Sequence, residues 1–280
     1  MVNMNRLTTK KRAQVIAALV EGNSVRATVR MTDVAKNTIT KLVRDLGPAC
    51  AAYMDRTLRN LPCKRIQCDE IWSFVYAKAK HVPADKMGQF GYGDVWTWVA
   101  IDADTKLVCS WLVGGRDAGC AYEFMQDLAA RLAHRVQLTT DGLNVYLNAV
   151  EDAFGADIDY ATLVKLYGQP AEAEKRYSPA RIIGVQAAMI TGQPNPKHIS
   201  TSYIERQNLT MRMSMRRFTR LTNGFSKKVE NHIAAIALHY MHYNFCRIHQ
   251  SLRVTPAMEA GVSDRVWSVE ELIAILDLNE

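Results

Sequence analysis

The chain has 280 residues, of which 48% are hydrophobic and 22% charged, a composition typical of a globular protein with room for two or three domains. Its longest apolar stretches, such as residues 233–238, are far shorter than the roughly 20 residues of a membrane span, and its basic N-terminus has no signal-peptide core. We therefore expect a cytoplasmic protein, and because the six cysteines include no Cys-x-x-Cys pair we expect free thiols rather than a zinc site.

The formal net charge of +7 is concentrated in two segments. Residues 1–46 carry nine Lys or Arg against three acids, and residues 205–228 carry seven against one. A single charge run is often only a solvated face of the protein. Two dense clusters in different parts of the chain instead indicate a nucleic-acid partner.

Three short helices are predicted at the N-terminus, over residues 9–21, 25–31 and 35–46, with Gly22 and Gly47 as stops. Their order and lengths are typical of a helix-turn-helix, and a generic helical bundle is the alternative. The apolar positions that would close its small core are Val25, Val29, Val34, Ile39 and Leu42. The outward-facing residues of the third helix that would meet base edges and phosphates are Asn37, Thr38, Lys41 and Arg44.

From residue 64 the pattern changes to strands that alternate with helices, which indicates an α/β layer fold. The segment 158–167 is ambiguous, with a strand preferred. The predicted order is a strand over 66–76, a hairpin of 95–101 with 107–113, a helix over 121–134, a strand over 135–140, a helix over 143–154, the strand 158–167, a loop over 168–177, a hairpin over 181–190 and a long helix from Ser202.

Asp69 is an acid inside a strand that otherwise has the composition of a buried one. Its neighbours include Cys68, Ile71 and Trp72. An ionised carboxylate in such surroundings is costly unless it is paired or bound to a metal ion. Asp69 is therefore a candidate metal ligand, and the adjacent Glu70 is the alternative.

Asp141 directly follows the predicted strand 135–140. Sites in α/β sheets usually form at the C-terminal ends of strands, which makes this acid a second candidate. An aspartate before a glycine and a helix is also an ordinary N-cap, and that interpretation competes with the first. Asp102 and Asp104 lie in a predicted turn, so we assign them no catalytic role.

Glu205 lies in the first turn of the long helix and can be interpreted in two ways. With Ser202 it forms the pattern of a capping box. At 3.6 residues per turn it also shares one helical face with Asn208, Arg212 and Arg216, and Arg side chains suit phosphate oxygens. The competing acids, none followed by an Arg-rich face, are Glu151, Asp157 and Asp159.

Three sequence blocks carry a resemblance to a known family. They are Cys68-Asp-Glu-Ile-Trp-Ser-Phe, Thr140-Asp-Gly and Tyr203-Ile-Glu-Arg-Gln-Asn-Leu-Thr-Met-Arg. In this order they resemble the signature blocks of DDE-type bacterial insertion-sequence transposases, in the ribonuclease-H-like transposase and integrase superfamily. The segment Tyr243-Asn-Phe-Cys-Arg-Ile-His-Gln-Ser-Leu, followed by Thr255-Pro-Ala, is similar to the closing segment of such enzymes. The resemblance covers most of residues 60–260.

The resemblance implies an α/β fold, with a ribonuclease-H-like mixed sheet flanked by helices and preceded by a small all-α helix-turn-helix domain. It also implies where the domains begin and end. The expected boundaries are 1–47 for the helix-turn-helix domain, 48–62 for a linker, 63–250 for the catalytic domain with an insertion at about 155–200, and 251–280 for a C-terminal tail.

The family's catalytic residues and metal ligands would then be Asp69, Asp141 and Glu205. Three clustered carboxylates repel one another unless cations are bound, and oxygen ligands favour Mg²⁺ or Mn²⁺ over zinc. We therefore expect two such ions, as in two-metal phosphoryl transfer. The implied activity is strand cleavage at transposon ends, which frees a 3′-hydroxyl, followed by attack of that hydroxyl on target DNA.

The expected partners are the terminal inverted repeats of a transposon and its target, both double-stranded DNA, so the protein would be nucleoid-associated when bound. Two ends must be held together, which implies a homodimer or a larger assembly. The N-terminal helices would read the repeats, and the catalytic domain would contact phosphates with little sequence preference. Its expected DNA-binding residues are Arg206, Asn208, Arg212, Arg216, Arg217 and Arg220.

Two other functions remain open from the residues alone. A helix-turn-helix transcriptional regulator needs no acidic triad and would bind an operator without metal-dependent cleavage. A ribonuclease-H-like nuclease would cut DNA and never join it. The appearance of new covalent joints in the products separates both from a transposase.

Overall fold

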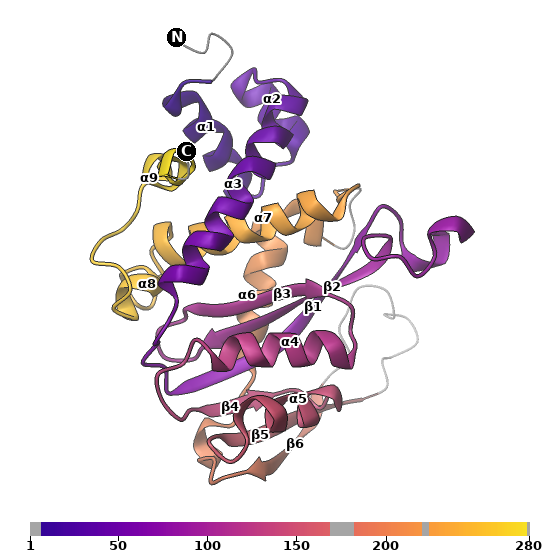
Figure 1. Ribbon diagram of the computed structural model, residues 1–280, viewed down its shortest axis with the longest axis vertical. Helices are drawn as coiled ribbons and strands as arrows, with labels where there is room; N and C mark the ends of the chain where they lie inside the picture. Colours follow the sequence, from indigo (N-terminus) through magenta and orange to yellow (C-terminus); the bar gives the residue numbers. More distant parts are fainter. Residues whose placement is uncertain (1–6, 169–181, 220–223, 279–280) are drawn as a thin grey trace.

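The computed structural model describes residues 7–168, 182–219 and 224–278 (Figure 1). At the centre of this described part lies a six-stranded sheet with the order β3-β2-β1-β4-β5-β6. The strands are β1 (Arg65–Val75), β2 (Gly93–Asp102), β3 (Val108–Gly114), β4 (Gln137–Thr140), β5 (Asp159–Tyr167) and β6 (Ile182–Thr191).

The sheet is mixed. Strands β1, β2 and β3 are antiparallel neighbours, β4 and β5 run parallel to β1, and β6 is antiparallel to β5. The turn between β2 and β3 is held by Asp102, whose carboxylate accepts from the Thr105 amide at 3.1 Å. A mixed sheet of this order, flanked by helices, confirms the predicted α/β, ribonuclease-H-like fold class.

The shortness of β4 creates an opening in the sheet. β4 ends at Thr140 and pairs only with residues 65–67 of β1. The rest of β1 continues to Val75 with β2 on one side and no β4 partner on the other. The loop that follows β4 therefore lies beside the middle of β1.

Helices cover both faces of the sheet. In Figure 1, α4 (Ala118–Ala129) and α5 (Val145–Phe154) lie in front of the sheet, and α6 (Ser202–Ser214) lies behind it. α6 contacts β1 and β2, while α4 contacts β3 and β2. α7 (Val229–Met241) continues into a π-helical turn over residues 242–246. α5 and α6 begin within two residues of their predicted starts, whereas α4 begins three residues before and ends five residues before the predicted helix 121–134.

Three helices form the N-terminal segment: α1 (Thr9–Val20), α2 (Val25–Thr32) and α3 (Lys36–Thr57). The predicted core positions Val34, Ile39 and Leu42 are buried, and Val25 and Val29 pack against the core with part of their surface exposed. The prediction was wrong about the end of the third helix. α3 does not stop before Gly47 but continues to Thr57, so most of the expected linker is helical.

A glycine is needed at position 47 because another helix packs closely there, and not because a helix ends there. A Cβ at this position would lie 2.4 Å from the Cα of Ala234, so α3 and α7 cross there at a distance that only glycine permits. The crossing fixes α3 on the half of the molecule that contains the sheet. A sequence pattern cannot separate a glycine needed at a crossing from one that ends a helix.

The N-terminal helices do not stand apart from the rest of the protein. α3 packs on α7, and α9 (Val269–Ala274) returns to lie against α1 (Figure 1). A single cluster of buried apolar residues runs from α1 and α3 through the sheet to α9. The three helices predicted for an N-terminal domain are therefore present, but they share one apolar core with the rest of the protein. The predicted domain boundaries stay predictions.

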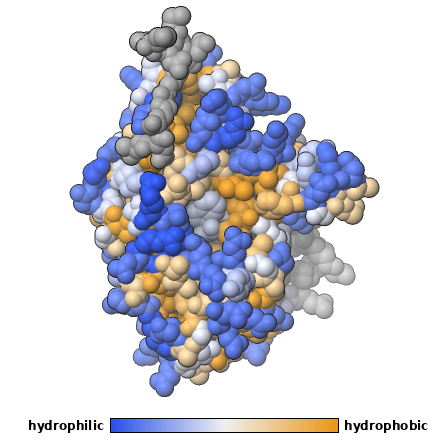
Figure 2. All heavy atoms as spheres, viewed as in Figure 1, coloured by the Kyte–Doolittle hydropathy of each residue, from blue (hydrophilic) through white to orange (hydrophobic). Residues whose placement is uncertain are grey.

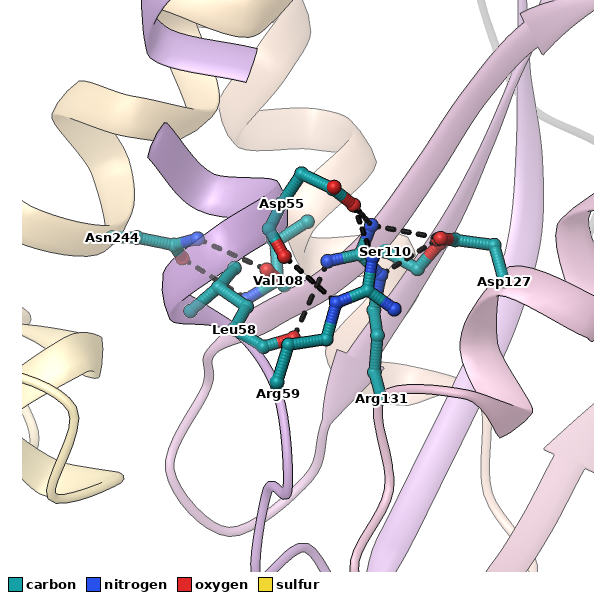
Figure 3. Close-up of polar contacts among 8 residues, drawn as sticks. All are labelled: Asp55, Leu58, Arg59, Val108, Ser110, Asp127, Arg131 and Asn244. Carbon is teal, nitrogen blue, oxygen red and sulfur yellow. Dashed lines mark hydrogen bonds and ion pairs between the residues drawn. The ribbon is translucent and has the colours of Figure 1, made fainter. Parts of the chain in front are cut away.

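Polar contacts fasten the end of α3 to the sheet and to α4 (Figure 3). The guanidinium of Arg131 donates to Asp55 at 2.8 Å, to Asp127 at 2.7 Å and to the Leu58 carbonyl at 3.3 Å. Ser110 of β3 also donates to Asp127. Because Arg131 is 8% exposed, these partners are needed to hold its charge in the interior.

Asn244, from the block that resembles a closing segment, protects the free edge of the sheet. Its amide group donates to the Val108 carbonyl and accepts from the Val108 amide, both at 3.0 Å (Figure 3). The side chain thus replaces a neighbouring strand at the start of β3, where unpaired backbone groups would otherwise remain. Its role here is structural.

One further difference concerns the segment after β5. The hairpin predicted over 181–190 was wrong: Ile182–Thr191 is one strand, β6, that pairs with β5. Its run of apolar and β-branched residues favours a continuous strand, and the expected turn has no glycine pair to form it. Residues 169–177 of the predicted loop lie outside the described part of the chain.

The surface view in Figure 2 shows a mostly hydrophilic face with an apolar area at mid-height. Within the described ranges, no helix has both the length and the apolar character to cross a bilayer. The six cysteines are free thiols, as predicted, although the sulfur atoms of Cys63 and Cys109 lie 3.8 Å apart in the interior.

Candidate active site

A cavity of about 680 Å³ opens between the end of β4, strand β5 and helix α6. It brings together all three acids that the sequence predicted as a triad. Asp69 comes from the middle of β1, Asp141 from the loop directly after β4, and Glu205 from the first turn of α6. The other polar side chains that line it are Arg116, Lys165, Thr201, Asn208 and Arg212.

Asp69 is held by two hydrogen bonds and is mostly buried. One carboxylate oxygen accepts from the Glu70 amide and the other from the Asn208 side chain, both at 2.9 Å. Burial, followed by the charge of Asp141, raises the pKa of Asp69 to about 6, and the charge of Glu205 adds to this shift. The carboxylates of Asp69 and Asp141 lie within 4.8 Å of each other, so each disfavours the charged form of the other.

Glu70, the alternative to Asp69, meets different surroundings. It is 7% exposed, and its two oxygens accept from the hydroxyl of Tyr146 and from Arg116, the latter at 3.1 Å. Burial raises its pKa to about 7. Although its carboxylate lies within 4.8 Å of those of Asp69 and Asp141, its oxygens are engaged by protein donors. Glu70 therefore positions Arg116, whereas Asp69 faces the cavity.

Asp141 does not act as the N-cap of the following helix. α5 begins at Val145 with Asn144 in the cap position, three residues beyond Asp141. One oxygen of Asp141 accepts from the Leu143 amide at 2.9 Å, and the other lies 3.8 Å from the guanidinium of Arg116. A local turn holds the carboxylate at the mouth of the cavity, where it is about one-third exposed.

Glu205 does not form the capping box that its spacing allows. The Ser202 amide donates to Ser200 instead, and α6 has no side-chain cap bond. The Glu205 carboxylate accepts from Thr201 at 2.7 Å and pairs with the ammonium of Lys165. Lys165 thus supplies the positive charge that the carboxylate needs in this partly buried place.

The competing acids between Asp141 and Glu205 point elsewhere. Asp157 and Asp159 both pair with Arg135, and Asp159 also accepts from the Gln193 amide at 2.8 Å. Glu151 is exposed on α5 and does not line the cavity. Among the acids between residues 141 and 205, none of these three lines the cavity, whereas Glu205 does. The carboxylates that lie within 4.8 Å of one another are those of Asp69, Glu70 and Asp141, and Glu205 is not in that group.

The donor set fits hard divalent cations. The cavity offers carboxylate oxygens from three elements and no cysteine or histidine among its lining residues. Asn208 is 3% exposed, and its carbonyl oxygen has no hydrogen-bond partner within the described residues. A buried acceptor without a partner beside three mutually repelling carboxylates is what a cation with its bound water would satisfy.

The predicted DNA-binding residues divide into several groups. Asn208 and Arg212 line the cavity. Arg206, next to Glu205 in α6, is exposed and does not line it. α6 ends at Ser214, so Arg216 is not on the expected helical face but belongs to a separate short 3₁₀ turn over residues 216–218. That part of the predicted face was wrong. The sequence around Ser214 has no glycine or proline that would have signalled the end of the helix.

The other residues predicted to contact DNA lie after α6 and on α3. Arg217 is half-buried and donates to the Asn231 carbonyl and to Ser226 at 3.1 Å, which is a structural use. Arg220 lies outside the described residues. The four residues expected on the recognition helix are all exposed on the first half of α3: Asn37, Thr38, Lys41 and Arg44.

Sequence reasoning missed the two cations nearest to the acids. Arg116 follows the Gly114-Gly115 pair at the end of β3, and Lys165 lies in β5. A charged residue just after a strand end was a signal that could have pointed to Arg116. Lys165 offered no such signal, because alternation within a strand does not reveal which face borders a site.

Neither a protein-family model nor a curated protein matches this chain. Similar solved structures include the piggyBac transposase synaptic complex with hairpin DNA, 12% identical with a TM-score of 0.42 over 100% of this chain and 73% of that one. The Mos1 transposase paired-end complex with left transposon end is 14% identical, with a TM-score of 0.25 over 56% and 59%. The Mos1 Strand Transfer Complex is 11% identical, with a TM-score of 0.25 over 85% and 76%. All three are transposase structures at low sequence identity to this chain.

Proposed function

We propose that this protein is a DDE-type transposase that cuts DNA at transposon ends and joins the freed 3′-hydroxyl to target DNA. The observation that carries the proposal is the convergence of Asp69, Asp141 and Glu205 from three separate elements on one cationic cavity. An acidic triad among arginine and lysine side chains suits a phosphodiester substrate, whose charge the cations bind and whose reacting oxygens lie near the acids.

The three carboxylates would hold two Mg²⁺ or Mn²⁺ ions. When bound, such ions activate an attacking oxygen and stabilise the leaving oxygen of an in-line phosphoryl displacement. Asn208 would keep Asp69 oriented through its 2.9 Å hydrogen bond, and Thr201 would do the same for Glu205 at 2.7 Å. The protein itself then needs no covalent nucleophile.

The arginine side chains of the cavity would bind the phosphodiester backbone of the substrate. Arg116 stacks over the ring of Trp96, with 4.7 Å between the guanidinium carbon and the ring centroid, and is anchored by Glu70. An arginine fixed on two sides presents its remaining donors in one direction, which suits a phosphate oxygen. Arg212 lines the same cavity one helical turn beyond Asn208 and would extend this contact along the strand.

The exposed residues at the start of α3 would read the terminal inverted repeats, and two transposon ends would be held by a dimer or a larger assembly. The predicted domain boundaries and the predicted cytoplasmic, nucleoid-associated location belong to this proposal. The alternatives remain a nuclease that cuts without joining and a transcriptional regulator that binds without cutting.

The experiment is strand cleavage and strand transfer on labelled DNA that carries the ends flanking the gene. Wild type is compared with Asp141→Asn in Mg²⁺ and in EDTA, and Asp157→Asn is the matched control because Asp157 pairs with Arg135 away from the cavity. We expect metal-dependent nicking and joining by wild type and by the control, and a loss of at least about 100-fold in Asp141→Asn.

Each result has a separate meaning. Cleavage without new covalent joints would favour the nuclease, and binding without cleavage by wild type would favour the regulator. Activity of Asp141→Asn equal to that of the control would remove Asp141 from the site.

A further inference from the structure

A second cavity, of about 540 Å³, lies between the start of α2, the 3₁₀ turn over residues 216–218 and α7. We call it the α2 cleft. Among the described residues that line it there is no Asp or Glu, and five are cations from four different elements or loops. These are Arg26, Lys36, Arg216, Arg217 and Lys227.

Most of this positive charge is uncompensated. Arg26, Lys36, Arg216 and Lys227 are exposed, and within the described residues none of them forms an ion pair. Cations that converge from separated parts of the chain repel one another, so the folded state gains nothing by gathering them. Their convergence points to a polyanionic ligand.

Backbone groups add to the same field. The first turn of α2 contributes Ser24, Val25 and Arg26 to the lining, and the Ser24 hydroxyl is occupied as the cap by the Ala27 amide at 3.1 Å. The first amides of a helix have no partner inside the helix and carry the positive end of its dipole. They suit phosphate oxygens.

A buried side chain independently indicates a ligand. His239 of α7 lines the cleft and is only 4% exposed, yet its Nε2 atom has no hydrogen-bond partner within the described residues. Burial lowers the pKa of His239 to about 3, so its imidazole is neutral at physiological pH. The Nε2 atom is enclosed, so it can donate to a phosphate oxygen once the His239 side chain turns toward the cleft that it lines.

The cleft adjoins the far end of the helix that carries Glu205. Gly22 has a φ of +83°, and a Cβ there would lie 3.0 Å from the Met213 carbonyl, so the turn before α2 packs against the end of α6. Glu205 and Ser214 are about 14 Å apart along the axis of α6, from the 1.5 Å rise per residue. This corresponds to about four base pairs of B-DNA at 3.4 Å per step.

We propose that the α2 cleft binds the phosphodiester backbone of duplex DNA, independently of sequence, about four base pairs from the acidic cavity. The inference rests on the proposed function in taking DNA as the substrate. The cleft would join the N-terminal helices and the catalytic half into one DNA-binding surface, with Arg212 between the two cavities. The bases contacted by α3 would then lie at a fixed distance along the DNA from the phosphate that reacts.

The test is the salt dependence of duplex binding, measured by fluorescence anisotropy in EDTA so that catalysis does not contribute. Lys227→Gln and Arg26→Gln each remove one exposed charge, and Lys197→Gln is the matched control because Lys197 is exposed outside both cavities. For each cleft variant we expect weaker binding by about 3- to 10-fold on every sequence and a log–log salt slope less steep by about 0.9. Lys227→Arg should restore the wild-type slope.

His239→Leu distinguishes a specific phosphate-binding site from non-specific attraction by positive charge, because it removes a hydrogen-bond donor without changing the charge. It should weaken binding without changing the salt slope, and urea unfolding of each variant verifies that the fold is intact. A wild-type slope in both Arg26→Gln and Lys227→Gln would overturn the proposal, as would an equal change in Lys197→Gln. If the slopes change as expected and no cleavage occurs in Mg²⁺, the transposase proposal fails and the DNA-binding cleft stands.

Discussion

Asp69 and Glu70 are consecutive acids in β1, but the fold gives them different tasks. Neighbouring side chains in a strand point to opposite faces, so Asp69 meets Asn208 of α6 while Glu70 meets Tyr146 of α5. The oxygens of Glu70 are already engaged by Tyr146 and Arg116. The two acids therefore offer a direct test of which carboxylate binds metal.

In a metal titration, we expect Asp69→Asn to weaken Mn²⁺ binding by at least about 10-fold, because it removes a charged ligand that faces the cavity. Glu70→Gln keeps its shape and should change the affinity by less than about 3-fold. Isothermal titration calorimetry measures both. A larger loss in Glu70→Gln than in Asp69→Asn would make Glu70 the ligand and reverse the assignment.

The pKa of Asp69 gives a pH prediction. Because its folded-state pKa of about 6 lies above the ordinary value near 4, the folded protein binds this proton more tightly than the unfolded chain. Its contribution to stability is therefore highest below about pH 4 and falls as the pH rises to about 6. In EDTA, the free energy of unfolding of Asp69→Asn relative to wild type should rise by about 2 kcal/mol across this window. Urea denaturation at several pH values measures it, and a flat difference would contradict the shift.

At the scale of elements, the crossing of α3 and α7 decides how the N-terminal helices are held. Gly47 permits the crossing, and the contacts of Arg131 with Asp55 and Asp127 fix the lower end of α3. Together they make α3 a single connection from the other two N-terminal helices to the sheet. The position of the residues that would read DNA is thereby coupled to the position of the acids.

Gly47→Ala tests the crossing. Alanine normally stabilises a helix relative to glycine by up to about 1 kcal/mol, but at this position its Cβ would clash with the backbone of α7. We expect a net loss of about 1 to 3 kcal/mol in urea denaturation. Gly119→Ala in α4 is the matched control: Gly119 is exposed in a helix, and its Cβ would meet only the tip of the Asp117 side chain, at 3.3 Å, so stability should change by less than about 1 kcal/mol. A stabilised Gly47→Ala protein would show that α7 can move away.

At the scale of the molecule, the buried apolar residues form one core from α1 to α9. Separate domains joined by a flexible linker would instead have separate cores. We expect one cooperative transition in differential scanning calorimetry, with van't Hoff and calorimetric enthalpies that agree. Two resolved transitions, the smaller shifted by Gly47→Ala, would show that the helix-turn-helix segment unfolds independently.

Much of the fold could be read from local patterns. The β-branched and aromatic residues of 66–76 identified β1, the turn that contains Asp102 and Asp104 identified the hairpin of β2 and β3, and Gly22 marked the end of the first helix. The wrong assignments share one cause. The end of α3, the end of α6 and the pairing of β6 each depend on a partner distant in sequence, and no local pattern contains that partner.

By itself, the sequence predicted the three acids that line the first cavity, because residue type and strand or helix context are local properties that the chain displays directly. The tertiary structure alone decided which charges accompany them. Arg116 follows β3 and Lys165 lies in β5, and their meeting with the acids depends on where β4 stops and how α6 packs. It also decided the α2 cleft, since its five cations converge only after α2 has docked against the end of α6. Electrostatic interactions depend on distance in space, and that distance is set by packing and not by sequence separation.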